Sequence, residues 1–165
     1  MIVPVLAAML AAGEAQADGT GWDTFAARCL EPMSEVRQPD MSGLEPGGAA
    51  RMAELMQGEN PSATVYAVRD RVLLSVLPER DGHFLTCTIV DESDTAVAAL
   101  DQYETWREEA IVAERWREVT QKTALGPDLY STTWREPKVA LSRWTGADER
   151  GRAVLFSIRT TDLES

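Results

Sequence analysis

The dipeptide Asp81-Gly82 stands between two apolar runs and places the tightest constraint on how this chain folds. A two-residue type I′ turn needs positive φ at both positions, and Asp-Gly between alternating apolar residues is its strongest short-range signal. Closing the chain on this turn pairs Val76 with Cys87 and Ser75 with Thr88. The sequence therefore predicts an antiparallel hairpin with one wholly apolar face and one mixed face.

The alternation of side chains along a strand assigns the hairpin residues to these two faces. The apolar face holds Val72, Leu74, Val76, Leu85, Cys87 and Ile89. The mixed face holds Leu73, Ser75, Leu77, Phe84, Thr86, Thr88 and Val90. We expect the apolar face to pack against helices.

An uncharged apolar run over residues 2–12 precedes Ala15-Gln16-Ala17, the small-x-small pattern that signal peptidase accepts. The run is too short to cross a membrane as a helix. We expect residues 1–17 to be a signal peptide, residues 18–165 to form a single domain, and the protein to be periplasmic or secreted. No lysine or arginine precedes the run, so the alternatives are a true start further upstream or an ordinary buried segment.

Net charge narrows the range of partners. The 165-residue chain has 16 basic and 27 acidic residues, a formal net charge of −11, and loss of residues 1–17 removes only one of these charges, Glu14. An acidic surface repels nucleic acid and anionic lipid. We therefore expect no nucleic-acid partner and no stable membrane insertion after signal cleavage.

The two cysteines predict a disulfide bond between a helix and the sheet. Trp22, Phe25, Cys29 and Met33 recur at helical spacing, so Cys29 lies on the apolar stripe of a short helix. Cys87 lies on the apolar face of the hairpin, and no CxxC or Cys/His spacing indicates a metal site. In an oxidising compartment such a pair forms a disulfide, with two buried free thiols as the alternative.

The remaining elements predict an α+β fold with helices mainly on one face of the sheet. Residues 31–61 are mostly loop with a short helix at 49–57, and a longer helix follows the hairpin, its apolar stripe changing side near Ala113. Strands are expected at 63–68, 72–77, 129–135, 138–144 and 153–160, besides the second strand of the hairpin. The predicted order is α-βββ-α-βββ, an antiparallel sheet of about six strands.

No recognised catalytic, metal or cofactor motif is present, so no catalytic residue, metal or cofactor is predicted. His83, the only histidine, is expected on an exposed turn. The acidic segment 91–94 lacks the spacing of a Ca²⁺ loop and is better explained as a helix N-terminus, capped by Ser93 or Asp94. Trp22 and Trp106 fit helix stripes and are expected in the core.

A candidate binding face follows from the mixed side of the hairpin. It comprises Ser75, Phe84, Thr86 and Thr88, with Trp134 and Trp144 from the C-terminal half and Ser142 and Ser157 as continuations. Such a face suits a small ligand, a protein partner or a homodimer contact, and plain solvent exposure is the alternative.

Residues 25–32, the Thr-Cys-Thr strand at 86–88 and the ending at 160–165 resemble small exported proteins of alphaproteobacterial type whose function is uncharacterised. The resemblance carries no catalytic residue over. The order of elements and the acidity are also similar to type III secretion chaperones, although those are cytosolic and need neither signal peptide nor disulfide.

Three functions are therefore considered. The first is a periplasmic, non-enzymatic binding or accessory domain. The second is a small periplasmic hydrolase built around His83 and carboxylates that the fold assembles. The third is an acidic, secretion-chaperone-like protein.

Overall fold

The computed structural model describes residues 19–58, 60–80, 84–120, 126–135, 138–146 and 153–161. The predicted signal peptide, the turn at Asp81-Gly82 and His83 lie outside these ranges, as does the side chain of Trp134. The helical elements are α1 Gly21–Phe25, the π-helical turn η1 Ala26–Leu30, α2 Glu31–Ser34, α3 Ala49–Leu55 and α4 Ala96–Val112. The strands are β1 Thr64–Arg69, β2 Val72–Leu77, β3 Thr86–Asp91, β4 Trp116–Glu118, β5 Leu129–Arg135, β6 Lys138–Gly146 and β7 Ala153–Thr161.

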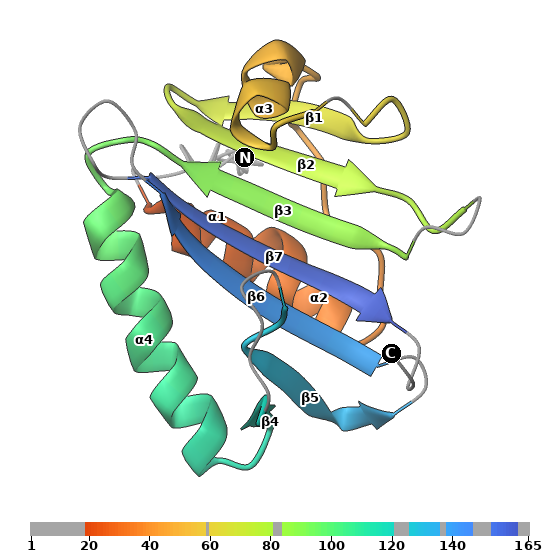
Figure 1. Cartoon of the computed structure of the whole chain (residues 1–165), viewed down its shortest axis with the longest axis vertical. Helices are drawn as coiled ribbons and strands as arrows, with labels where there is room; N and C mark the ends of the chain where they lie inside the picture. Colours follow the sequence, from red (N-terminus) through yellow and green to blue (C-terminus); the bar gives the residue numbers. More distant parts are fainter. Residues whose placement is uncertain are drawn as a thin grey trace, which may run out of the picture.

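The strands form one antiparallel sheet in the order β1-β2-β3-β7-β6-β5-β4 (Figure 1). The last strand, β7, therefore lies between β3 and β6, in the middle of the sheet. The α+β class is confirmed, but the sheet has seven strands among the described residues rather than about six. The added strand, β4, forms where the stripe of α4 ends, and its Trp116 packs on Trp106, with ring centroids 5.7 Å apart.

The register predicted for the hairpin of β2 and β3 is confirmed. Val76 lies opposite Cys87 and Ser75 lies opposite Thr88. A single-residue slip would turn every side chain of β3 to the other face, so the apolar pattern fixes this pairing. β1 pairs with β2 through a bulge between Ala67 and Arg69.

The first face of the sheet packs against α1, η1, α2 and α4 around an aromatic cluster. Trp22 is the centre of this cluster, with its ring 5.0 Å from Phe156 and 5.3 Å from Tyr103 and from Trp106. Phe25, Tyr103 and Phe156 are fully buried. The expectation that Trp22 and Trp106 join the core is confirmed, with Trp106 only partly buried.

The predicted disulfide is confirmed. Cys29 and Cys87 are bonded with an S–S length of 2.04 Å and Cα atoms 5.8 Å apart, and both are fully buried. Cys29 lies in η1, where the N–H of Glu31 bonds the carbonyl of Ala26 five residues earlier. This helical segment continues through Ser34, further than the expected loop start at residue 31, because Pro32 is tolerated in the first turn of α2.

The second face of the sheet carries only α3, so the helices lie mainly on the first face, in agreement with the expectation (Figure 1). Met52 of α3 packs with Leu73 and Val90 in a smaller apolar cluster of its own. The chain enters α3 through Gly48, whose φ of 81° is left-handed and whose added Cβ would lie 2.4 Å from Leu73. Glycine is therefore required where α3 approaches the sheet.

Candidate functional site

A pocket of about 420 Å³ lies between α3 and the second face of the sheet. Its α3 wall includes Met52, Ala53 and Met56, and its sheet wall includes hydroxyl-bearing Ser75 and Thr88. The volume falls in the range of roughly 300–1,000 Å³ typical of small-molecule pockets. None of the described residues that line it is charged.

The pocket includes three residues of the predicted binding face: Ser75, Thr86 and Thr88. Phe84 and Trp144 are half-buried and do not line it. The predicted face is therefore in two parts. Ser75, Thr86 and Thr88 lie under α3, whereas Trp144 lies on β6, outside the pocket.

The strand register aligns four hydroxyls in a row across β2, β3, β7 and β6. Ser75 lies opposite Thr88, Thr88 opposite Ser157, and Ser157 opposite Ser142. The hydroxyl oxygens of Thr88 and Ser157 are 2.8 Å apart and share a hydrogen bond. This row begins in the pocket and continues beyond it onto β7 and β6.

Sequence reasoning missed the contribution of α3. The stripe of Met52, Leu55 and Met56 predicted a helix, but periodicity alone does not say which face of the sheet a helix covers. The alanines at 49, 50 and 53 were the available signal, because small side chains leave space between a helix and the sheet beneath it. Met56 is 50% exposed and lies at the rim.

An ion pair ties α3 to the end of β3. The guanidinium of Arg51 donates to both carboxylate oxygens of Glu92, at 2.5 and 3.0 Å, and to Glu54 at 2.8 Å. These hydrogen bonds raise the pKa of Arg51, and the bond with Glu92 contributes most to the rise. The Glu92 side chain is almost fully buried, so the pair satisfies a carboxylate that burial would otherwise penalise.

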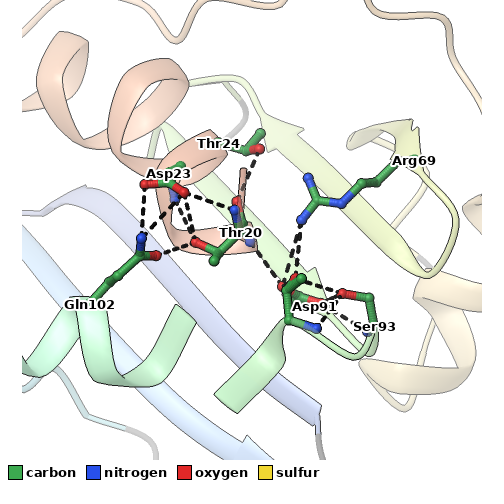
Figure 2. A network of polar contacts seen from close by, with 9 residues as sticks. Thr20, Asp23, Thr24, Arg69, Asp91, Ser93 and Gln102 are labelled. Atoms are coloured by element: carbon green, nitrogen blue, oxygen red, sulfur yellow. Dashed lines mark hydrogen bonds and ion pairs between the residues drawn. The ribbon is translucent and has the colours of Figure 1, made fainter. Parts of the chain in front are cut away.

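Asp91, the neighbour of Glu92, is fully buried and accepts hydrogen bonds from two directions (Figure 2). The N–H of Gly21 at the start of α1 donates to one oxygen at 2.9 Å. The hydroxyl of Thr95 donates to that same oxygen at 3.1 Å, and the N–H and hydroxyl of Ser93 donate to the other oxygen at 2.8 and 2.5 Å. The guanidinium of Arg69 lies 3.9 Å away.

The start of α1 fits against Asp91 because its first residue has no side chain. A Cβ added to Gly21 would lie 2.6 Å from the Asp91 carboxylate. Beside it, Thr20 and Asp23 form a capping box, and Gln102 of α4 contacts both residues (Figure 2). This network joins α1, β3 and α4, and it gives Asp91 a structural role.

The acidic segment 91–94 does not assemble a cation site. Asp91 is bonded to α1 and Glu92 to α3, so the two carboxylates serve different neighbours. The N-cap is Thr95, one residue beyond Asp94 and two beyond Ser93, and the Ser93 hydroxyl donates to Asp91 instead. Across the part of the chain that the structure describes, no group of three His, Cys, Asp or Glu residues is arranged to hold a metal ion.

Tyr103 carries the one buried tyrosine hydroxyl that has no hydrogen-bond partner among the described residues. Burial raises the pKa of its phenol, and the negative charge of Asp128 raises it further. The phenol therefore stays protonated and acts as part of the aromatic core.

Comparison with known proteins finds no matching family model, no similar curated protein and no similar solved structure. Among the described helices, none has the length and apolar character needed to cross a membrane.

Proposed function

We propose that this protein is a periplasmic, non-enzymatic binding domain whose ligand site is the pocket between α3 and the second face of the sheet. The observation that carries the proposal is the lining of that pocket: apolar side chains from α3 over a floor that includes Ser75, Thr86 and Thr88. Pockets of this composition hold a largely apolar ligand and orient it through a few polar groups.

The same lining favours binding over catalysis. A serine or threonine hydroxyl becomes a useful nucleophile only beside a general base, and no described lining residue can act as one. The hydroxyl of Thr88 is already shared with Ser157 at 2.8 Å. Hydroxyls both donate and accept, so they suit recognition of a polar group on the ligand.

Filling the pocket tests the proposal. Ala53 is half-buried in the α3 wall, so Ala53→Phe places an aromatic ring in the space that a ligand would use. We expect the affinity for the uncharged dye N-phenyl-naphthylamine, measured by fluorescence titration, to fall about tenfold or more, equivalent to about 1.4 kcal/mol.

The matched control is Ala98→Phe, which makes the same change on the exposed surface of α4. This variant should bind the dye as the unchanged protein does. Equal affinity in the unchanged protein and in Ala53→Phe would rule out the pocket as the site.

Export is tested separately by mass. If residues 1–17 are a signal peptide, the protein recovered from the periplasm begins at Asp18. We expect its intact mass to correspond to residues 18–165. Recovery of the 1–165 mass from the cytosolic fraction would contradict the proposed compartment.

A further inference from the structure

Three basic side chains gather on the second face of the sheet, on the half that lies away from α3. The register places Thr86, Arg159 and Ala140 side by side on β3, β7 and β6. Ala140 is followed by Tyr130 on β5 and Arg117 on β4. The ammonium of Lys138 lies 4.7 Å from the centre of the Tyr130 ring, and the guanidinium of Arg117 lies 6.0 Å from it.

This arrangement contrasts with the charge of the whole chain, which is −11. Strand residues alternate between faces, and none of the described strand residues on the second face is acidic. The carboxylate of Glu92, where β3 ends, is held by Arg51 of α3. In an acidic protein, basic side chains such as Arg159 and Arg117 on this face favour the approach of an anion there over the acidic remainder of the surface.

Arg159 connects this basic surface to the pocket. Its partner across the strands is Thr86, which lines the pocket, and adjacent strands lie about 4.8 Å apart. The Arg159 side chain is exposed and lies on the same face as Thr86. The backbone of Arg159 is therefore adjacent to that of a pocket-lining residue, and an arginine side chain is long enough to reach the pocket border from there.

We propose that the ligand is a single-chain amphipathic carboxylate, with its apolar chain under α3 and its carboxylate on Arg159. This inference rests on the proposed function. The uncharged lining would penalise a buried ion, so the charged end must stay outside. A guanidinium pairs a carboxylate through two parallel hydrogen bonds. The acidity of the remaining surface disfavours a large anionic polymer on this face.

Decanoate and decanol test this inference, because they share an apolar chain and differ in the charge of the head group. We expect isothermal titration calorimetry to show tighter binding of decanoate than of decanol to the unchanged protein. Arg159→Gln should weaken decanoate binding about tenfold, because it removes one charge-assisted contact. The same variant should leave decanol binding unchanged. Arg37→Gln is the matched control, since Arg37 is an exposed arginine paired with Glu35, and it should change neither affinity.

The outcomes separate the inference from the function on which it rests. If decanoate and decanol bind equally, or Arg159→Gln weakens both to the same extent, the carboxylate assignment is wrong and the pocket stands. If neither compound binds the unchanged protein and the dye does not bind either, the proposed function fails as well. A thermal melt of Arg159→Gln that matches the unchanged protein excludes misfolding as the cause of a lost affinity.

Discussion

Reduction of the Cys29–Cys87 disulfide is expected to lower the midpoint of thermal unfolding by on the order of 10 °C. The bond joins residues 58 positions apart, and closing a loop of that length removes about 4 kcal/mol of chain entropy from the unfolded state. For a domain of this size, each kcal/mol shifts the midpoint by about 2–4 °C. Differential scanning calorimetry with and without reductant gives the measurement, and the β2–β3 register should remain.

The double variant Cys29→Ala/Cys87→Ala is the control for the chemistry of reduction. It should melt near the reduced protein, whereas Cys87→Ser should melt lower, because it places a hydroxyl in a fully buried apolar site. An unchanged midpoint on reduction would contradict the entropic account. Two free thiols in the natively purified, denatured protein would contradict the bond itself.

Asp91→Asn is expected to destabilise the protein by about 3 kcal/mol, the next largest effect. Both oxygens of Asp91 accept hydrogen bonds, from Gly21 on one side and from Ser93 on the other. An amide replaces one of these acceptors with a donor, so an N–H would face another N–H in a site without exposure. Urea unfolding followed by tryptophan fluorescence measures the change.

Asp101→Asn is the matched control, because Asp101 is exposed on α4. It should change stability by no more than about 0.5 kcal/mol. If both variants unfold at the same urea concentration, Asp91 does not join α1 to the sheet in the way its contacts indicate.

Local patterns predicted the local features of the fold. The register of β2 with β3 followed from a two-residue turn and an alternation that leaves only one apolar face. The disulfide followed from two independent periodicities that turned Cys29 and Cys87 toward one core. The bounds of β5, Leu129–Arg135, match the predicted strand because proline and glycine interrupt the chain nearby.

Features that depend on distant contacts could not be predicted in this way. No local pattern says that β7 enters between β3 and β6, since strand order depends on how two sub-sheets meet. β4 is only three residues long, too short to show the alternation of a strand, and the change of apolar stripe near Ala113 did not reveal that Trp116 packs on Trp106. Tertiary packing determines both the position of β7 in the sheet and the formation of β4.

The candidate site was likewise predictable only where it depends on local patterns. Ser75, Thr86 and Thr88 were assigned to one face from alternation alone, and they line the pocket. The pocket itself exists because α3 crosses that face, which alternation does not encode. The basic surface around Arg159 was also missed, because it requires the pairing of β3 with β7 and of β5 with β4.

The central position of β7 has a consequence for how the protein is made. A ribosome delivers the amino terminus first, so β1, β2 and β3 emerge well before Ala153–Thr161. Until β7 is translated, β3 and β6 each present an unpaired edge, and the nascent chain consists of two incomplete sub-sheets. Cooperative folding must therefore wait for almost the whole chain, and a transcript that ends early yields a product with two strand edges open to aggregation.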